Sequence, residues 1–169
     1  FEKISVLDGG YNEWVRLGLP TEDSVRKFNP AKFNTSFREN IFVGKESTLK
    51  AIGDKSYILL NALTKDIHSG ENPRYGRPGR IPSSLNVPFH KLVDSKTGKF
   101  KNPEEAAEIF NSMDISPDKR ILNYCGGGIA ATLDAFILYQ LGFKNLQIYD
   151  NSMSEWAMDE TLPIETDKL

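Results

Sequence analysis

Residues 120–131 read Arg120-Ile121-Leu122-Asn123-Tyr124-Cys125-Gly126-Gly127-Gly128-Ile129-Ala130-Ala131. This stretch decides the fold, because a short apolar run of the kind buried in parallel sheets leads directly into three glycines. Apolar side chains then recur at helical spacing, at Ile129, Leu133, Phe136, Ile137 and Leu141. Gly142 follows and ends the pattern. We therefore expect a strand, a sharp turn at Cys125 and a helix.

The same two signals alternate along the neighbouring sequence. Short apolar runs at 57–60, 85–87 and 146–149 predict further strands. A helix is expected over 45–52, and a second helix begins at Asn102, which has the residue type of an N-cap and is followed by a proline and two glutamates. This alternation predicts an α/β fold with a mostly parallel sheet.

One pattern occurs twice in the chain, about 140 residues apart. Residues 4–14 and 146–156 each contain a short apolar run that predicts a strand (4–7 in the first copy), an aspartate, a turn of small residues and a Glu-Trp pair, and each is followed by Leu-Pro-x-Glu. A period of this size is that of a domain. We therefore expect residues 1–22 to be the tail of a truncated first domain, 23–40 to be a linker packed over a domain surface, and 41–169 to be a complete second copy.

The composition limits the classes of function. The 169 residues are 39% hydrophobic and 26% charged, with a formal net charge of −2, so we expect no nucleic-acid partner. No apolar run approaches the roughly 18 residues that span a membrane, and we expect no membrane partner. A single cysteine excludes an internal disulfide, and His68 and His90 lie far apart, so we assign no metal site and no cofactor.

The turn at Cys125 is the candidate functional site. In a parallel sheet, ligands bind beyond the carboxyl ends of the strands, where this turn lies. Three glycines in a row let the backbone curl with positive φ, so that successive amides converge on one point. The amino end of the following helix adds unpaired N–H groups and a partial positive charge, which favours the thiolate form of a cysteine.

The turn at Cys125 has three other interpretations. Cys125 could be a buried structural residue, as free cysteines often are, but the glycines beside it favour a functional role. Gly126, Gly128 and Ala131 match a dinucleotide-binding fingerprint, and Asp150 ends the next strand, yet only about 20 residues follow Asp150. A cysteine-dependent phosphatase would need an arginine where Ala131 stands.

Taken together, Cys-x-x-Gly-Ile-Ala-Ala between a strand and a helix resembles the active-site loop of the rhodanese family, particularly its tandem-domain thiosulfate and mercaptopyruvate sulfurtransferases. Residues 76–88 resemble the family's Gly-His-Ile-Pro-Gly-Ala-x-Asn-x-Pro segment, and 149–156 resemble its closing Asp-Gly-Ser-Trp-x-Glu-Trp. Residues 6–10 resemble the end of the preceding, usually non-catalytic, domain. The resemblance implies a five-stranded parallel sheet with helices on both faces.

The resemblance also implies a mechanism in which Cys125 is the catalytic nucleophile. Its thiolate would take sulfur from a small anionic donor, thiosulfate or 3-mercaptopyruvate, and the resulting persulfide would pass it to cyanide or a thiol acceptor. Backbone amides would stabilise the thiolate and the persulfide, from Gly126, Gly127, Gly128, Ile129 and Ala130. Three arginines crowd the loop at 72–81, and we expect Arg77 to bind the donor, because the glycine and proline around it fix its backbone.

Several positions depart from the family pattern. The family's Leu-Asp-x-Arg is 60–63 here, where Asn61 replaces the acid and Leu63 replaces an arginine often tied to the anionic substrate. Arg80 replaces the histidine of Gly-His-Ile-Pro. The loop positions that carry basic or hydroxyl groups in the two donor classes are Gly126 and Gly127, so no donor preference follows. The alternative function is a non-catalytic rhodanese-like module that binds a partner.

Overall fold

A computed structural model describes residues 3–36 and 38–167 of the chain. The first and last residues of the predicted domain limits, and Phe37 of the predicted linker, lie outside the described residues. Five strands form one sheet in the order β1-β5-β4-β2-β3, and every neighbouring pair is parallel. The strands are β1 (Phe42–Val43), β2 (Tyr57–Asn61), β3 (Leu85–Asn86), β4 (Arg120–Tyr124) and β5 (Leu146–Tyr149). The predicted parallel sheet is therefore confirmed.

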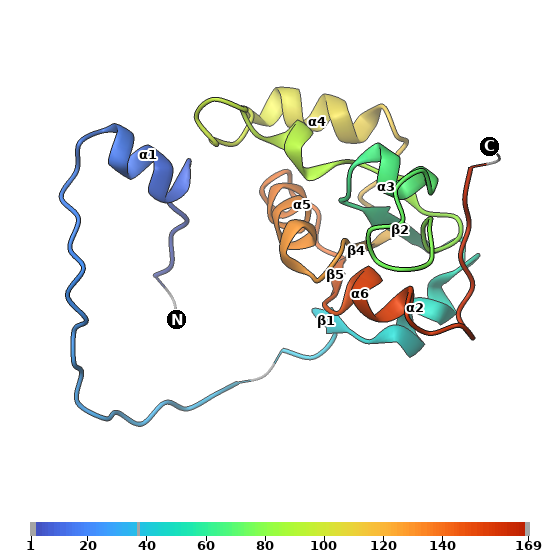
Figure 1. Ribbon diagram of the computed structural model, residues 1–169, viewed down its shortest axis with the longest axis horizontal. Coiled ribbons are helices and arrows are strands. Elements are labelled where there is room, and N and C mark those ends of the chain that lie inside the picture. The colour runs from blue at the N-terminus through green and yellow to red at the C-terminus, as the bar shows by residue number, and fades with distance from the viewer. Residues whose placement is uncertain (1–2, 37, 168–169) are drawn as a thin grey trace.

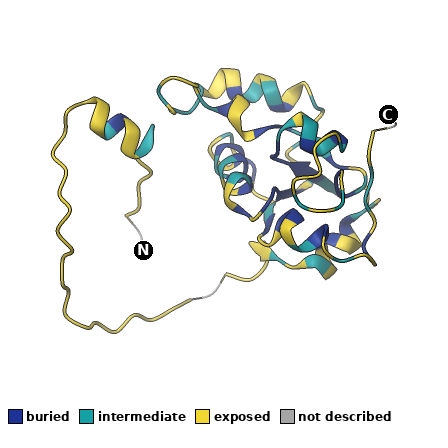
Figure 2. Ribbon diagram, in the orientation of Figure 1, coloured by how far each residue is buried: buried dark blue, intermediate teal, exposed yellow. Residues whose placement is uncertain are grey.

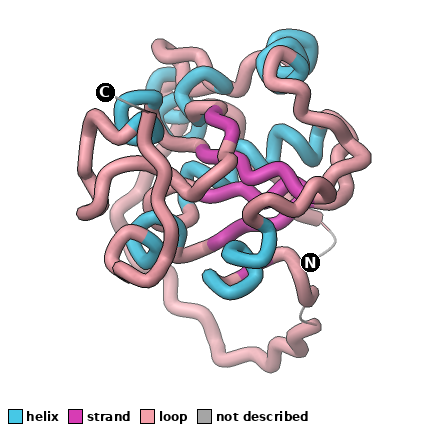
Figure 3. Tube along the Cα trace, turned by 90° about the vertical axis from the view of Figure 1, so that its right-hand side faces the viewer, coloured by secondary structure: helices cyan, strands magenta, loops and turns pink. Residues whose placement is uncertain are grey.

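Helices cover both faces of this sheet (Figure 1, Figure 3). They are α2 (Lys45–Ala51), α3 (Lys65–Ser69), the 3-10 turn η1 (Phe89–Leu92), α4 (Pro103–Asn111), α5 (Ile129–Gln140) and α6 (Ser152–Trp156). Helix α1 (Gly10–Arg16) lies apart from the sheet (Figure 1). No helix in the described ranges is long and apolar enough to cross a membrane.

Alternation along the central strands produces two buried clusters, because successive strand residues point to opposite faces. Leu59 and Leu122, which are register partners, belong to a cluster that includes α2 and α6. Leu60 and Ile121 belong to the other cluster, with residues of α4 and of the carboxyl half of α5. The helices on the two faces thus hold β2 and β4 in the interior, and β4 delivers Cys125 at its carboxyl end.

The first residues of the chain differ from the prediction. Residues 4–7, expected as a strand, have no regular structure, and Ile4 is 72% exposed. A strand is stable only where a neighbour satisfies its backbone groups, and no described strand lies beside this segment. It is instead anchored by Asp8, whose Oδ1 accepts a hydrogen bond of 2.8 Å from the Phe100 amide.

The internal repeat is visible in the structure. In α1, Trp14 Nε1 donates a 2.9 Å hydrogen bond to the carbonyl of Pro20. At the end of α6, Trp156 Nε1 donates a 2.8 Å hydrogen bond to the carbonyl of Pro163. The same contact therefore closes both copies of the Glu-Trp and Leu-Pro pattern, although Trp156 is fully buried and α1 lies at the edge of the molecule.

The predicted linker does not pack over the domain. Residues 23–36 have no regular structure, and they run as an exposed segment in Figure 2. Val25 is 90% exposed and Phe28 is 82% exposed. The expectation that this stretch covers a domain surface was therefore wrong, because its apolar residues lack the regular period that would place them on one side of the chain.

Candidate active site

Only one of the three glycines in the turn after β4 adopts a left-handed backbone conformation. Gly128 has φ +81 and is the N-cap of α5, whereas Gly126 and Gly127 do not have positive φ. The expectation that all three glycines use left-handed conformations is corrected accordingly. A side chain at Gly128 would also be blocked, because a Cβ there would lie 2.6 Å from Asp150 Oδ1.

Gly126 is a glycine for a different reason, namely the approach of Tyr75. A Cβ built on Gly126 would overlap the Tyr75 hydroxyl and would lie 2.6 Å from Tyr75 Cε1. Gly127 meets no such contact, since the nearest atom to a Cβ there is Ser154 Oγ at 3.8 Å. The turn is therefore closed on one side by a tyrosine from the loop that precedes β3.

The start of α6 holds the turn on another side. The Cys125 amide donates a 2.9 Å hydrogen bond to Ser152 Oγ, which in turn donates to the Tyr149 carbonyl over 2.6 Å. The amides of Met153 and Ser154 donate to the carbonyls of Cys125 and Gly126, over 3.1 and 2.8 Å. Ser152 has φ +50, a conformation that is costly for a residue with a side chain. The ends of β4 and β5 are thus tied together at Cys125.

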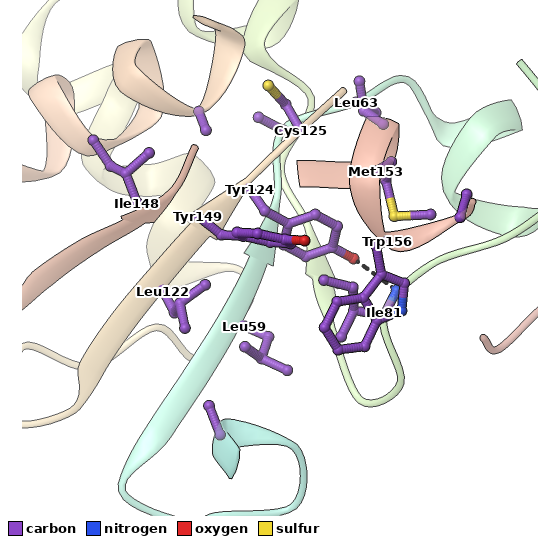
Figure 4. Packing of buried hydrophobic residues seen from close by; sticks show 14 of the residues in the cluster. Leu59, Leu63, Ile81, Leu122, Tyr124, Cys125, Ile148, Tyr149, Met153 and Trp156 are labelled. Carbon is purple, nitrogen blue, oxygen red and sulfur yellow. Dashed lines mark hydrogen bonds between the residues drawn. The ribbon is translucent and has the colours of Figure 1, made fainter. Parts of the chain in front are cut away.

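Cys125 lies on the wall of a cavity of about 750 Å³. Its side chain is only 2% exposed, and its sulfur points away from Tyr124, Tyr149 and Trp156 in the core (Figure 4). The cavity is lined by Leu63, Thr64, Asp66, Ile67, Asn72, Arg74, Tyr75, Phe89, Cys125, Gly126, Gly127, Ile129, Ala130 and Leu133. The cysteine is therefore buried from bulk solvent but next to a space that a small molecule can enter.

The predicted amides around the cysteine are available for a ligand. Within the described part of the chain, the amides of residues 126–130 donate no hydrogen bond to another protein group. The Cys125 sulfur is likewise not an acceptor for them. This is expected for the first turn of a helix, whose N–H groups have no intrahelical acceptor. The glycines, Ile129 and Ala130 therefore offer N–H donors without a protein acceptor in the described ranges, at the amino end of α5.

Two charged side chains line the cavity, Asp66 and Arg74. Hydrogen bonds from Thr64 and from Asn72 hold the pKa of Asp66 below its usual value, and Asn72 Nδ2 lies 2.9 Å from Asp66 Oδ2. Asp66 is therefore a charged acceptor that the protein already satisfies. Arg74 lies with its guanidinium 5.9 Å from the centre of the Tyr75 ring, so the cation and the tyrosine are neighbours.

Arg77, the arginine expected to bind the donor, is placed elsewhere. Its guanidinium donates to the carbonyls of Trp156, Ala157, Asp159 and Leu162, over 2.5 to 3.1 Å. It is not among the residues that line the Cys125 cavity. We correct this expectation: Arg77 binds the carboxyl end of α6 and the chain that follows it, where the unpaired carbonyls attract a cation.

Three other residues that the sequence analysis names also have clear positions. Arg80 is 9% exposed and pairs with Glu165 at 2.5 Å and Asp167 at 2.6 Å, so it fastens the carboxyl-terminal segment. Leu63 gives the cavity an apolar wall where the family often has an arginine. Burial, and next the charge of Arg80, lower the pKa of His68 to about 4. None of these three residues supplies a positive charge to the cavity.

Sequence reasoning missed two residues at this site. Tyr75 carries no motif, although the glycine beside Cys125 is consistent with an incoming side chain. Ser152 lies in the recognised closing motif, but its hydrogen bond to the Cys125 amide depends on how β5 and α6 meet. Among the described residues, no group of three or more histidine, cysteine or acidic side chains could hold a metal ion.

Comparisons with known proteins agree with this geometry. The Rhodanese-like domain model matches residues 47–159. The 3-mercaptopyruvate sulfurtransferase of Escherichia coli (strain K12) is 33% identical over 167 residues, which are 97% of this chain and 59% of that protein. The thiosulfate/3-mercaptopyruvate sulfurtransferase 2 of Arabidopsis thaliana is 34% identical, over 96% of this chain and 54% of that protein. The chain thus spans little more than half the length of these relatives.

The fold also matches solved structures. The anaerobic ergothioneine biosynthesis enzyme from Chlorobium limicola, solved with trimethyl histidine, superposes with a TM-score of 0.88. The match covers 98% of this chain and 42% of that one, at 22% identity. At this identity the likeness concerns the arrangement of the sheet and helices.

Proposed function

The chain belongs to the family of rhodanese-like domains, and from this premise we propose that it is a sulfurtransferase that carries sulfur on Cys125 as a persulfide. One observation carries the proposal. Cys125 lies at the junction of β4 and α5, on the wall of a cavity of about 750 Å³, beside five amides that have no acceptor within the described chain. A thiolate needs such a setting, with oriented dipoles and little competing water.

The reaction has two displacements. The Cys125 thiolate attacks the outer sulfur of thiosulfate, the Cys125–sulfur bond forms, and the sulfur–sulfur bond of the donor breaks, with sulfite leaving with the electron pair. With 3-mercaptopyruvate, the carbon–sulfur bond breaks instead, and after proton uptake pyruvate leaves. Cyanide or a thiolate then attacks the outer sulfur of the persulfide and restores the Cys125 thiolate. The amides of residues 126–130 stabilise the negative charge in each state.

Arg74 is the cation that we propose for the anionic donor, in place of Arg77. It lines the cavity with Cys125, whereas the Arg77 guanidinium is occupied by four carbonyls. Both candidate donors are anions, and a cation at the mouth of a partly enclosed cavity attracts them more strongly than one in bulk water. Leu63 is apolar and adds no second cation to the cavity wall. Among the described residues that line the cavity, Arg74 alone can pair with the negative charge of the donor.

We also propose the domain limits that the repeat suggests, namely the tail of a first rhodanese domain at 1–22, a linker at 23–40 and the catalytic domain at 41–169. The support is the hydrogen bond from tryptophan to a proline carbonyl, which Trp14 and Trp156 both make. The relatives are longer than this chain, which leaves room for a further domain in them.

Steady-state assays test the proposed activity. Thiosulfate and 3-mercaptopyruvate are each supplied with cyanide, and thiocyanate is measured for the wild type and for Cys125→Ser. We expect thiocyanate from at least one donor with the wild type and none with the serine variant. A folded wild type that produces none from either donor would overturn the proposal and leave a module that binds a partner without catalysis.

A further inference from the structure

Tyr75 occupies the space in which a side chain at position 126 would stand. A Cβ on Gly126 would overlap the Tyr75 hydroxyl, so the glycine and the tyrosine are a matched pair. Both residues line the cavity that holds Cys125. The hydroxyl therefore lies at the first residue of the turn that follows the nucleophile, although Tyr75 is fifty positions away in the sequence.

The Tyr75 hydroxyl is also free to bind a ligand. Within residues 3–36 and 38–167 it makes no hydrogen bond, while its ring packs against the buried cluster that includes Cys125. A phenolic hydroxyl that is held by a packed ring and has no acceptor is a ready donor. Arg74 lies beside the ring, so a cation and a neutral donor face the same space.

We infer that Tyr75 is a substrate-contacting residue of this site, whose hydroxyl donates a hydrogen bond to the oxyanion end of the sulfur donor. The inference rests on the proposed sulfurtransferase function. Gly126 and Gly127 supply no side chain to the turn, and Leu63 supplies no charge, so the polar contacts of the donor come from Tyr75, Arg74 and the backbone amides. The substrate class is a sulfane or thiol compound with a sulfonate-like or carboxylate group.

Tyr75→Phe tests the hydroxyl, because it keeps the ring that packs against the core. We expect kcat/KM for the better of thiosulfate and 3-mercaptopyruvate to fall about 10- to 100-fold, as for a hydrogen bond to a charged group. Tyr139→Phe is the matched control, since Tyr139 is 61% exposed and lies outside the cavity. An unchanged kcat/KM in Tyr75→Phe would overturn the inference.

A donor without oxygen separates a contact from a structural effect. Inorganic polysulfide carries sulfane sulfur but no oxyanion, and persulfide on Cys125 can be followed by intact mass. We expect Tyr75→Phe to be loaded by polysulfide as fast as the wild type while it is slow with the oxyanion donor. Equal losses with both donors would mean that Tyr75 only shapes the turn, and would contradict the inference.

The same experiment distinguishes a failure of the proposed sulfurtransferase function from a failure of the proposed role of Tyr75. If wild-type Cys125 takes sulfur from neither oxyanion donor, the proposed function fails. If the wild type takes sulfur and Tyr75→Phe matches it with that donor, the proposed function stands and the role of Tyr75 fails.

Discussion

The three glycines after Cys125 differ in what prevents a side chain. At Gly126 the obstacle is the Tyr75 hydroxyl, and at Gly128 it is both the positive φ and Asp150. Gly127 has neither obstacle, since the nearest atom to a Cβ is 3.8 Å away. The three glycines should therefore differ in how much a substitution destabilises the turn, because each has different neighbours. Three identical residues in the sequence give no sign of this difference.

Gly128→Ala and Gly127→Ala are a matched pair that tests this difference. We expect Gly128→Ala to lower the free energy of unfolding by about 1–3 kcal/mol, because alanine at φ +81 is strained and its Cβ meets Asp150. Gly127→Ala should change it by less than about 1 kcal/mol. Urea unfolding measures both, and equal losses would show that the turn has another geometry.

Arg74→Gln tests the cation of the cavity. Loss of one charge at a partly exposed site should raise KM for the anionic donor about 5- to 10-fold, with little change in kcat. Arg120→Gln is the control, because Arg120 is at the opposite end of β4 and its guanidinium contacts Tyr57. Equal KM values for the Arg74 variant and the wild type, at low salt, would remove Arg74 from the site.

At the scale of elements, local signals predicted much of the fold. The strands at 120–124 and 146–149 were found to the residue, because each is a short, mainly apolar run of the kind that parallel sheets bury. The start of α4 was also found, and Asn102 forms the capping box with Glu105. These features are determined by residues that are close together in the sequence, and sequence patterns can therefore predict them.

Elements defined by distant partners were not predicted. β1 has only two residues and is recognised by its pairing with β5, and the five-residue α3 has no strong period. The arginine of the cavity was likewise misassigned, because the folded path of the loop, which no local pattern gives, puts Arg74 on the cavity wall and Arg77 on carbonyls at the end of α6. Cys125 was placed at the cavity by the strand, the glycines and the helix, which are adjacent in sequence.

Helix α5 contains an unusual buried acid. Asp134 is fully buried, and neither carboxyl oxygen has a hydrogen-bond partner among the described residues. Burial raises the pKa of Asp134 well above its usual value of 3.8. The folded state therefore keeps a proton that the unfolded state releases, and stability falls as the pH rises above about 4 towards the folded pKa.

Asp134→Asn should remove this pH dependence. We expect the variant to match the wild type near pH 4 and to be more stable at pH 7, with a wild-type slope of up to about 1.4 kcal/mol per pH unit. Thermal or urea unfolding between pH 4 and pH 8 measures it. Parallel pH profiles for the two proteins would contradict the assignment of a neutral Asp134.

At the scale of the whole molecule, the amino-terminal segment is fixed to the domain near one loop. Lys99 Nζ lies 2.8 Å from Glu13 Oε1, and Asp8 binds the Phe100 amide. Hydrogen bonds from Arg16 and then from Lys99 lower the pKa of Glu13 to about 2, so this carboxylate is charged at neutral pH. The loop after η1 therefore holds the amino-terminal segment, including α1, through Lys99 and the Phe100 amide.

Lys99→Ala should loosen this attachment. We expect faster hydrogen exchange in α1, while exchange in β4 is unchanged, because the ion pair with Glu13 is lost and the sheet is untouched. Lys96→Ala is the control, since Lys96 is exposed on the same loop. Unchanged exchange in α1 would mean that the segment does not depend on this pair.

The central claim is that this chain carries sulfur on Cys125. Intact-mass spectrometry of the wild type and of Cys125→Ser, after treatment with thiosulfate or 3-mercaptopyruvate and removal of the donor, tests it most directly. We predict one added sulfur on the wild type only, lost again on addition of cyanide with one thiocyanate formed for each sulfur removed. An unmodified wild type, or the same added sulfur on Cys125→Ser, would contradict the account.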